Sequence, residues 1–413
     1  MMQAVIMAGG KGTRLVALTK DEIPKPMVPV AGKPLLLWQV ERLKENGITD
    51  IIMVIGHLGN KIREYFGDGE KFGVAIRYFE ETEPLGTAGS FYYLKDMIHG
   101  DRFVMMSGDL FFDIDFQRMI HFHEEKGAVA TLFVHPNGHP FDSDLLVLDH
   151  DDKITAFDSK HNVRNYWYEN CVNAGIFVFE KKICDYVPEP VKRNLENDVI
   201  KGMLEAGEPI YGYCSPEYVK DVGTVERVNQ TLADIERGVI AGKCLKNKQR
   251  CIFMDRDGTI NQYKGLVYKG EDFTLEDCAV DAIRKINQSG RLGIVITNQP
   301  VVARGLCEIE DVENIHKKME TLLGKEGVFL DDVFYCPHHP DKGYPEENPA
   351  YKTPCECRKP KTGMIQKAAE RYNIDLAGSW MIGDTTMDIQ TGINAGMRTA
   401  LVQTGEAGND KKY

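Results

Sequence analysis

Two aspartates separated by one residue, Asp255 and Asp257, directly follow the apolar run Cys251–Met254. Such a run is typical of a buried parallel strand, and open α/β sheets carry their chemistry at the carboxyl ends of these strands. Two carboxylates this close cannot comfortably share a small dry space unless a cation lies between them. Gly258 then lets the backbone turn sharply. The pattern indicates a cation-binding carboxylate pair, with a solvated Asp-Gly turn as the plain alternative.

Further polar residues follow at strand ends and in loops. A hydroxyl and an amide at a strand end can donate to a phosphate oxygen, and adjacent cations can bind anionic groups. Taken singly, each residue could equally cap a helix or lie in a solvated loop. They stand in this order: Thr297 and Asn298 after the expected strand Leu292–Ile296, Arg304 in a loop, Arg358 beside Lys359, and Asp384 with Asp388 on one face of a helical turn.

Together these motifs resemble the haloacid-dehalogenase-like phosphatases. The resemblance implies that Asp255 attacks phosphorus, that Asp257 shuttles the proton, and that Lys359 neutralises the phosphoryl oxygens. It also implies Mg²⁺ on Asp255, on the backbone carbonyl of Asp257 and on Asp384. The substrate-binding residues implied are Thr297, Asn298, Arg304 and Arg358. Because no long insertion separates the motifs, we expect a minimal cap.

Cys336, His338, Cys355 and Cys357 have the residue types and spacing of a tetrahedral zinc site. The intervening segment is rich in Pro, Gly, Glu and Lys and cannot pack by itself, so a structural Zn²⁺ is expected to hold it. Free thiols are the alternative, and His339 could replace His338. With Arg358-Lys359-Pro360 after it, the loop resembles that of heptose 1,7-bisphosphate 7-phosphatases, with histidinol-phosphate phosphatases as the nearest alternative.

The N-terminus shows a second phosphate-handling pattern. The β-branched apolar run Gln3–Met7 leads into a glycine-rich turn whose backbone N–H groups can approach an anion closely. Lys25, between two prolines, lies on a stiff extended piece and could neutralise a triphosphate. A glycine-rich turn alone is weak support for a nucleotide site. The residues of the turn are Gly9, Gly10, Gly12, Thr13 and Arg14.

Over the first ~235 residues these segments resemble the sugar-1-phosphate nucleotidylyltransferases. The resemblance implies catalytic roles for Arg14 and Lys25 and a second Mg²⁺ on Asp109 and Asp221. It implies that the loop at Gly86 reads the base and that Asn173 contacts the sugar. One departure is Asp158-Ser159-Lys160-His161, where many relatives have Glu-Lys-Pro; Lys160 is the candidate that keeps a sugar-phosphate contact.

These elements predict an α/β protein of two domains. Residues 1–236 are expected to form a Rossmann-like nucleotidyltransferase domain with a mixed sheet. Residues 237–250, with two glycines and few large apolar side chains, are the expected linker. Residues 251–413 are expected to form a haloacid-dehalogenase-like Rossmannoid domain with a minimal cap and a zinc loop.

The composition of the chain limits the kinds of molecule that it is expected to bind. The 413 residues carry a formal net charge of −12, which argues against a nucleic-acid or anionic-membrane surface. No apolar run approaches the ~20 residues of a membrane span, and no signal segment opens the chain. Ten cysteines in such a chain do not imply disulfides. We therefore expect a cytoplasmic enzyme acting on small molecules; whether it forms a homo-oligomer stays open.

The two resemblances fit one pathway. A phosphatase acting on heptose 1,7-bisphosphate leaves heptose 1-phosphate, which is the kind of substrate a sugar nucleotidylyltransferase uses. The expected activity is bifunctional synthesis of a nucleotide-activated heptose from an NTP, with GTP favoured by family analogy for the α-anomer. Two alternatives stay open. One is the same chemistry on another phosphorylated sugar or polyol. The other is a histidinol-phosphate-type phosphatase with a nucleotide-sugar-sensing N-terminal domain.

Overall fold

The computed structural model describes residues 2–10, 16–343 and 346–413. The chain forms two compact units. The first is Met1–Val134, Leu146–Asp158 and Asn173–Cys244; the second is His135–Leu145, Ser159–Val172 and Leu245–Tyr413. Two short segments that precede residue 236 therefore belong to the same unit as the C-terminal part of the chain.

The first unit is built on a mixed sheet. Its strands among the described residues are β1 (Gln3–Met7), β4 (Asp50–Ile55), β5 (Ala75–Glu80), β6 (Arg102–Ser107), β8 (Ala130–His135), β9 (Leu145–Leu148), β10 (Ile154–Asp158), β11 (Val172–Glu180) and β12 (Ile210–Cys214). Their order is β10-β9-β11-β6-β1-β4-β5, with β8 beside β11 and β12 beside β8. Strands β6, β1, β4 and β5 run parallel, whereas β11 is antiparallel to β6.

Two short ribbons complete the first unit. β7 (Leu110–Asp113) pairs antiparallel with β13 (Tyr218–Asp221), and β2 (Pro29–Val30) pairs with β3 (Lys33–Pro34). The helices of this unit are α1 (Val16–Thr19), α2 (Leu35–Glu45), α3 (Gly59–Phe66), α4 (Phe91–Met97), α5 (Phe116–Glu125), α6 (Lys201–Glu205), α7 (Val225–Glu236) and α8 (Val239–Lys243). Buried apolar residues of β1, β4 and α2 belong to one core cluster, which fixes the strand ends that precede the first site.

The second unit contains a five-stranded parallel sheet in the order β16-β15-β14-β17-β18. Its strands are β14 (Cys251–Met254), β15 (Leu292–Asn298), β16 (Asp332–Cys336), β17 (Trp380–Gly383) and β18 (Arg398–Leu401). Successive residues of a strand point to opposite faces. Phe253 and Ile294 accordingly join one core cluster, and Met254 and Val295 join another.

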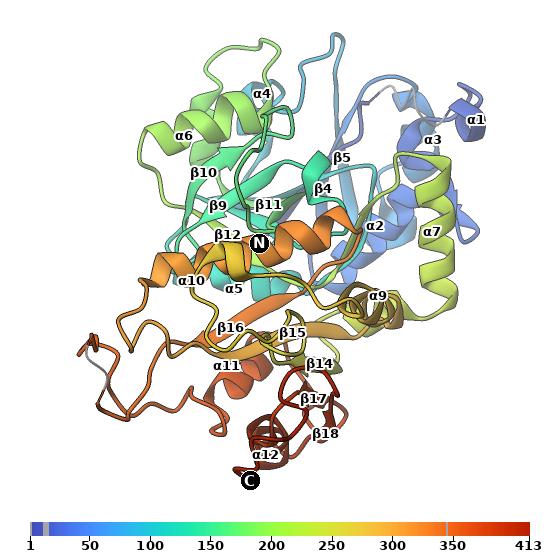
Figure 1. Cartoon of the computed structure of the whole chain (residues 1–413). Helices are drawn as coiled ribbons and strands as arrows, with labels where there is room; N and C mark the ends of the chain where they lie inside the picture. The colour runs from blue at the N-terminus through green and yellow to red at the C-terminus, as the bar shows by residue number, and fades with distance from the viewer. Residues whose placement is uncertain (1, 11–15, 344–345) are drawn as a thin grey trace. The chain divides into compact units, whose positions relative to one another are not determined.

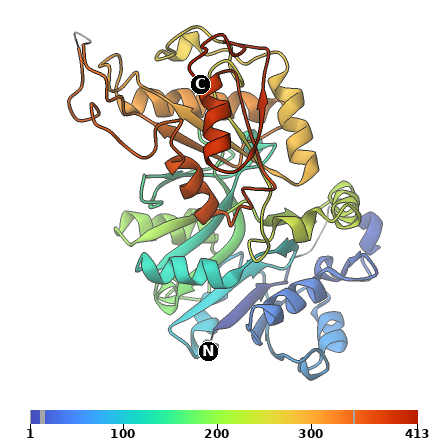
Figure 2. The same ribbon diagram turned by 90° about the horizontal axis from the view of Figure 1, so that it is seen from below.

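Helices cover both faces of this parallel sheet (Figures 1 and 2). α11 (Gly363–Arg371) supplies apolar residues to the cluster around Phe253, whereas α9 (Ala279–Ser289) and α10 (Ile309–Lys325) supply those around Met254. α12 (Thr386–Asn394) follows β17. With both faces covered, the polar carboxyl edge of the sheet is the natural place for chemistry.

The predicted fold class is confirmed: a mixed sheet in the N-terminal part and a Rossmannoid parallel sheet in the C-terminal part. Most element boundaries agree within one to three residues. A short 3-10 turn at Pro140–Asp142 packs against α10, because Pro140 is buried and its ring lies where a Cβ at Gly324 would stand. The expected linker 237–250 contains helix α8.

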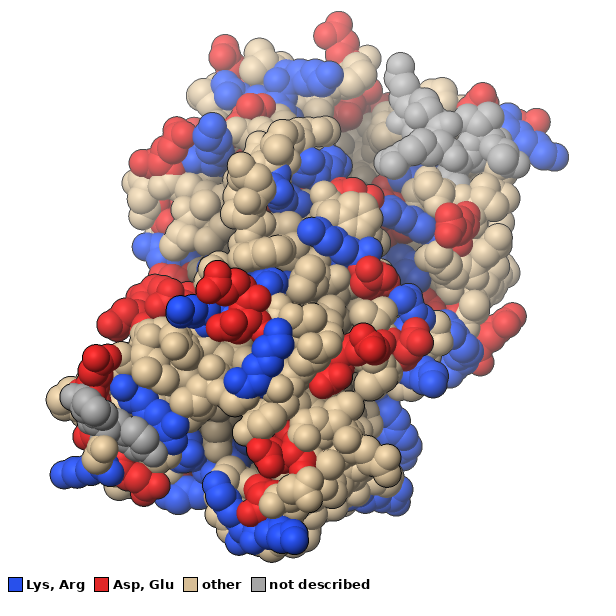
Figure 3. Space-filling view, viewed as in Figure 1, with Lys and Arg blue, Asp and Glu red and all other residues tan. Residues whose placement is uncertain are grey.

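Charged side chains are mixed on the molecular surface. On the face shown in Figure 3, Lys and Arg lie among Asp and Glu, without one broad basic field. On this face, phosphate binding would therefore depend on local cationic sites. Across the described part of the chain, no helix combines the length and apolar character needed to span a membrane.

Candidate active sites

Three buried carboxylates meet at the carboxyl edge of the parallel sheet. Asp255 follows β14, Asp384 follows β17, and Asp388 lies in the first turn of α12. β14 and β17 are hydrogen-bonded neighbours, which puts these two strand ends side by side. One carboxylate oxygen from each residue lies within 4.8 Å of the others. This spacing suits oxygen ligands around one divalent cation.

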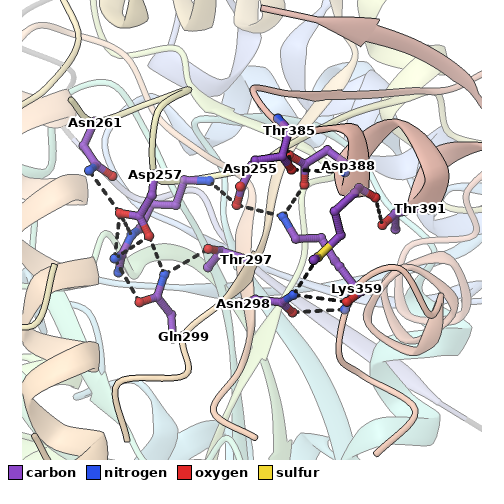
Figure 4. A network of polar contacts seen from close by, with 12 residues as sticks. Asp255, Asp257, Asn261, Thr297, Asn298, Gln299, Lys359, Thr385, Asp388 and Thr391 are labelled. Carbon is purple, nitrogen blue, oxygen red and sulfur yellow. Dashed lines mark hydrogen bonds and ion pairs between the residues drawn. The ribbon is translucent and has the colours of Figure 1, made fainter. Parts of the chain in front are cut away.

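The ammonium group of Lys359 enters the same cluster (Figure 4). Its Nζ lies 2.9 Å from Oδ1 of Asp255 and 2.5 Å from Oδ1 of Asp388. Only 3% of Lys359 is exposed. Burial by itself lowers the pKa of Lys359, but the two carboxylates raise it overall. Lys359 therefore keeps its charge, as a group that neutralises phosphoryl oxygens must.

The carboxylates themselves are crowded. Burial raises the pKa of Asp255 to about 7, although Lys359 acts in the opposite direction. Burial also raises the pKa of Asp384 to about 6. Oδ1 of Asp384 is buried and has no hydrogen-bond partner among the described residues, and a Cβ at Gly258 would collide with Asp384. A carboxylate oxygen without a partner, next to a space that stays open only because residue 258 is glycine, is suited to bind a cation.

The side chain of Asp257 turns away from this cluster into a second network (Figure 4). Its Oδ1 accepts hydrogen bonds from Nη2 of Arg256 at 2.9 Å and from Nδ2 of Asn261 at 3.1 Å. Its Oδ2 accepts from Arg256 Nη2 at 3.0 Å and from Nε2 of Gln299 at 2.8 Å. Arg256 is completely buried and lies 3.2 Å from Nε2 of His316. Asp257 is therefore held by residues of two segments, the loop after β14 and the end of β15.

Thr297 and Asn298 lie at the end of β15, next to these groups. The Thr297 hydroxyl accepts a 3.0 Å hydrogen bond from Gln299, and Thr297 is buried. The amide of Asn298 exchanges two hydrogen bonds with the backbone of Lys359, at 3.2 and 3.0 Å. As arranged here, Asn298 positions the lysine loop; its predicted contact with substrate stays a prediction.

Arg304 is close enough to Arg358 for its charge to act on that guanidinium group. Burial and the nearby charge of Arg304 lower the pKa of Arg358, while the cysteine thiols act to raise it. Nη1 of Arg358 also donates to the backbone carbonyl of His338 at 3.1 Å. Two close guanidinium groups can bind an anionic group, as the resemblance implies for this loop.

Cys336, His338, Cys355 and Cys357 converge into a second cluster, whose ligand atoms all lie within 4.8 Å of one another. Sγ of Cys336 is 3.5 Å from Sγ of Cys355 and 3.0 Å from Sγ of Cys357, and none of the three cysteines forms a disulfide. Nδ1 of His338 lies 3.4 Å from Sγ of Cys357. His339 instead lies 3.9 Å from Asp341. Three sulfurs and one imidazole at this spacing can hold a metal ion such as zinc.

In the first unit, Lys25 lies between two aspartates. Lys25 forms an ion pair with Asp109, which follows β6, and its Nζ is 4.0 Å from Oδ1 of Asp221. The ribbon of β7 and β13 brings the aspartates together, because the backbone N–H of Val222 donates to the carbonyl of Asp109. Although burial acts to raise it, Lys25 lowers the pKa of Asp109.

A cation also fits this first site. Oδ1 of Asp221 is buried without a hydrogen-bond partner in the described ranges. A Cβ at Gly223 would approach Oδ1 of Asp221 to 2.6 Å and Nζ of Lys25 to 3.2 Å. Arg227 forms an ion pair with Asp221 from α7. Two carboxylates, one with an open lone pair, are the ligand type that Mg²⁺ prefers.

For the other residues predicted for the first site, the structure shows fewer contacts that bear on their roles. Gly9 and Gly10 follow β1, and a side chain at Gly86 would collide with the carbonyl of Arg193. Oδ1 of Asn173 accepts a 3.2 Å hydrogen bond from the backbone of Gly175. Lys160 is exposed and belongs to the second unit, so the structure does not group it with Asn173. The predictions on Gly12, Thr13 and Arg14 lie outside the described residues.

Comparison with known proteins supports both halves. Residues 3–238 match the family model described as nucleotidyl transferase, and residues 356–412 match the HAD-hydrolase-like model. A UTP–glucose-1-phosphate uridylyltransferase of Synechocystis sp. is 33% identical over 60% of this chain and 66% of its own length. HddC from Yersinia pseudotuberculosis, crystallised with GMP-PN, superposes with a TM-score of 0.50 at 25% identity. That match covers 57% of this chain and all of HddC.

The C-terminal part has relatives of its own. A D-glycero-beta-D-manno-heptose-1,7-bisphosphate 7-phosphatase of Yersinia pestis is 39% identical over 38% of this chain and 81% of its own length. The chain belongs to two families, the nucleotidyl transferases and the heptose-bisphosphate 7-phosphatases. Both resemblances predicted from the sequence motifs are confirmed.

The nucleotidyl transferase and phosphatase parts also contain residues that sequence reasoning did not assign. These are Arg256, Gln299 and His316 around Asp257, and Arg227 beside Asp221. Arg256 lies between the two predicted catalytic aspartates, and Gln299 directly follows Asn298. Their adjacency was visible, but nothing in the sequence indicated that their side chains turn toward Asp257. His316 carried no signal, because it lies within the helix α10.

Proposed function

We propose that this chain is a bifunctional enzyme. It removes the C7 phosphate of heptose 1,7-bisphosphate and attaches a nucleotide to the resulting heptose 1-phosphate, releasing pyrophosphate. The observation that carries the proposal is that one chain contains two separate carboxylate–lysine clusters. Lys359 lies beside Asp255 in the second unit, and Lys25 lies between Asp109 and Asp221 in the first. The product of a 7-phosphatase is a sugar 1-phosphate, the substrate class of the other family.

The hydrolytic half uses six side chains. Asp255 attacks the C7 phosphorus and forms an aspartyl-phosphate while the bond to the sugar oxygen breaks. Asp257 protonates that oxygen and then takes a proton from the water that cleaves the aspartyl-phosphate. Lys359 balances charge on the phosphoryl oxygens, and Thr297 donates to one of them. Arg304 and Arg358 are proposed to bind the remaining phosphate of the bisphosphate substrate.

The transfer half works without a covalent enzyme intermediate. An oxygen of the sugar phosphate attacks the α-phosphorus of the NTP, and pyrophosphate leaves on the opposite side. Lys25 and Arg14 hold the phosphates, and the glycines Gly9, Gly10 and Gly12 with Thr13 supply donors to them. Gly86 lies in the loop proposed to contact the base, and Asn173 is proposed to contact the sugar. Lys160, whose segment is grouped with the second unit, is retained as the sugar-phosphate contact on the family resemblance alone.

Each site is proposed to hold Mg²⁺. The ligands are Asp109 and Asp221 in the first unit, and Asp255, the Asp257 carbonyl and Asp384 in the second. The unpartnered oxygens of Asp221 and Asp384 support these assignments. When bound, the cation screens phosphate charge from the attacking oxygen. A Zn²⁺ ion on Cys336, His338, Cys355 and Cys357 is proposed to hold the adjacent loop in place.

The nucleotide is proposed to be GTP. The solved structure of HddC with GMP-PN supports guanine, whereas the Synechocystis relative is named for UTP. The anomer is a separate question. The guanine analogy points to the α-anomer, but the phosphatase relative is named for the β-anomer. We propose domain limits of 1–236 and 251–413 for the two activities and a cytoplasmic location.

A panel assay tests the substrates. The purified enzyme is incubated with Mg²⁺, an NTP mixture and either anomer of heptose 1,7-bisphosphate, and the products are identified by mass spectrometry. The proposal predicts inorganic phosphate and GDP-heptose. Phosphate release without any nucleotide sugar, even from added heptose 1-phosphate, would instead favour a nucleotide-sugar-sensing N-terminal domain.

A further inference from the structure

Arg256 occupies an environment that arginines seldom have. It lies between Asp255 and Asp257 in the sequence, at the end of a central strand, and none of its surface is exposed. A fully buried guanidinium group is costly unless its donors are paired. A position between two catalytic aspartates does not by itself require an arginine, so the partners of Arg256 must explain it.

Most of those donors serve one carboxylate. Nε and Nη2 of Arg256 donate to Oδ1 of Asp257 at 3.2 and 2.9 Å, and Nη2 also donates to Oδ2 at 3.0 Å. Asn261 and Gln299 add one donor each, at 3.1 and 2.8 Å. A planar guanidinium fixes a carboxylate in direction as well as in place, which an ammonium group does not do. Asp257 is thus held in one orientation.

Arg256 is itself held from the far side. Nη2 donates to Oε1 of Gln299 at 3.0 Å, and Nη1 lies 3.2 Å from Nε2 of His316. A guanidinium can only donate, so Nε2 of His316 accepts and the ring proton lies on Nδ1. Burial lowers the pKa of His316 well below its ordinary value, with Arg256 adding to the effect, which keeps the imidazole neutral. Gln299 contacts both Arg256 and Asp257, closing the network.

We propose that Arg256 is a positioning residue for proton transfer: it fixes the direction of the Asp257 carboxyl group, and Gln299 and His316 fix Arg256. The inference rests on the proposed phosphatase activity. In that reaction the P–O bond to the sugar breaks as Asp255 bonds to phosphorus, and the proton of Asp257 goes to the departing sugar oxygen. Arg256 touches neither of the reacting atoms and acts only through Asp257.

A leaving-group comparison tests this role. The variants are Arg256→Met, Arg256→Lys and Gln299→Met, and kcat/KM is measured for heptose 1,7-bisphosphate and for p-nitrophenyl phosphate. A sugar alkoxide needs a proton to leave, whereas a nitrophenolate does not. We expect Arg256→Met to lower kcat/KM on the sugar substrate by roughly 10²-fold, the low end of general acid catalysis, and on the aryl substrate much less. Arg256→Lys should fall between, because lysine cannot bind a carboxylate bidentately.

Two controls keep the test decisive. Arg284→Met removes a guanidinium group on α9 that donates to the backbone carbonyl of Glu326 and takes no part in this network. It should change kcat/KM for neither substrate. When Asp257 has already been replaced by Asn, Arg256→Met should lower kcat/KM for the sugar substrate much less than it does in the wild-type enzyme. Gln299→Met leaves the buried arginine in place and provides the same readout if Arg256→Met does not fold.

The outcomes separate the inference from the function beneath it. The role of Arg256 is supported if Arg256→Met lowers kcat/KM only for the sugar substrate, and if this decrease is absent when Asp257 is already Asn. The positioning role is overturned if a folded Arg256→Met variant loses kcat/KM equally for both substrates. It is also overturned if the decrease is the same with Asp257 and with Asn at that position. The proposed phosphatase activity would stand in either case. A wild-type enzyme that releases phosphate from neither substrate would refute the proposed function itself.

Discussion

The ammonium group of Lys359 lies 2.9 Å from the carboxylate of Asp255, and both side chains are buried. Nucleophile and cation are thus already in contact before any substrate binds. The capping box of α12 holds the third member, because Oδ2 of Asp388 accepts from Thr385 while its Oδ1 meets Lys359. The second site is therefore organised by a helix N-terminus and two neighbouring strand ends.

Replacing Lys359 should impair hydrolysis more than folding of the rest of the chain. Lys359→Met is expected to lower phosphate release by roughly 10²–10³-fold, because a preorganised charge on the phosphoryl oxygens is lost. Lys361→Met is the matched control, since Lys361 pairs with the exposed Glu356 and donates to the backbone carbonyl of Cys355 but contacts neither Asp255 nor Asp388. Similar losses in both variants would contradict the role given to Lys359; malachite-green phosphate assays measure both.

The two activities should be separable by single carboxylate changes. Asp255→Asn is expected to abolish phosphate release because an amide cannot serve as the nucleophile. It should leave pyrophosphate release from GTP and heptose 1-phosphate nearly intact. Asp109→Asn should do the reverse. Coupled-enzyme detection of phosphate and pyrophosphate gives both rates, and loss of both activities in either variant would argue against independent sites.

Gly258 should tolerate no side chain. Its φ of 74° is in the left-handed region, and a Cβ there would collide with Asp384 and approach Gly405 to 3.0 Å. Gly258→Ala is expected to displace Asp384 and to lower phosphate release at least as much as loss of a metal ligand. Gly270→Ala, where a Cβ would meet nothing within 4 Å, should be silent. An active Gly258→Ala enzyme would show that this close approach is unimportant.

Removal of zinc should destabilise the second unit. Cys355→Ser is expected to lose one zinc per chain by mass spectrometry and to lower the Tm by more than roughly 5 °C, because the loop cannot pack by itself. Cys278→Ser, which changes an exposed thiol, should retain the metal. A Cys355→Ser protein with the zinc content and Tm of the wild type would rule out this cluster as the metal site.

His123 should make the first unit sensitive to mild acid. Burial lowers the pKa of His123 to about 4; Arg102 adds to the lowering and Glu124 opposes it. Its ring contacts Thr131 at 2.8 Å and faces Glu180 at 3.3 Å. The folded pKa is depressed, so stability is full above the unfolded pKa of 6.5 and is lost as pH falls toward 4.

At pH near 5 the loss should be about 2 kcal/mol relative to pH 7. His123→Gln removes the titrating group and should abolish this part of the pH dependence. Urea unfolding of the two proteins at both pH values provides the comparison. An unchanged difference between the pH values in the variant would assign the acid sensitivity to other groups.

The motifs predicted the chemistry better than they predicted its surroundings. Asp255, Asp384 and Lys359 could be grouped in advance because each directly follows a strand or a recognisable loop, and parallel strands end at one edge. His338 could not be separated from His339 by sequence, since both fit a Cys-x-His spacing within one residue. The fold separates them by placing His338 against Cys357.

Interactions set by side-chain direction were not predictable. The sequence placed Asn298 at the strand end, but it did not indicate that the amide also exchanges hydrogen bonds with the backbone of Lys359. Arg256 and His316 are 60 residues apart and meet only because α10 packs on the face of the sheet beside β14. Lys160 was assigned by motif to a sugar contact, yet its segment packs with the second unit. Such outcomes depend on tertiary packing, which no local pattern encodes.

The central claim is that hydrolysis at the second unit supplies the sugar phosphate used by the first. ³¹P NMR of the enzyme with heptose 1,7-bisphosphate, GTP and Mg²⁺ tests it in one time course. We predict that the C7 phosphate signal disappears first, and that pyrophosphate and the nucleotide-sugar diphosphate signals then rise together. Asp255→Asn should make nucleotide sugar only when heptose 1-phosphate is added. Formation of a nucleotide sugar that still carries its C7 phosphate, or none from heptose 1-phosphate, would contradict the account.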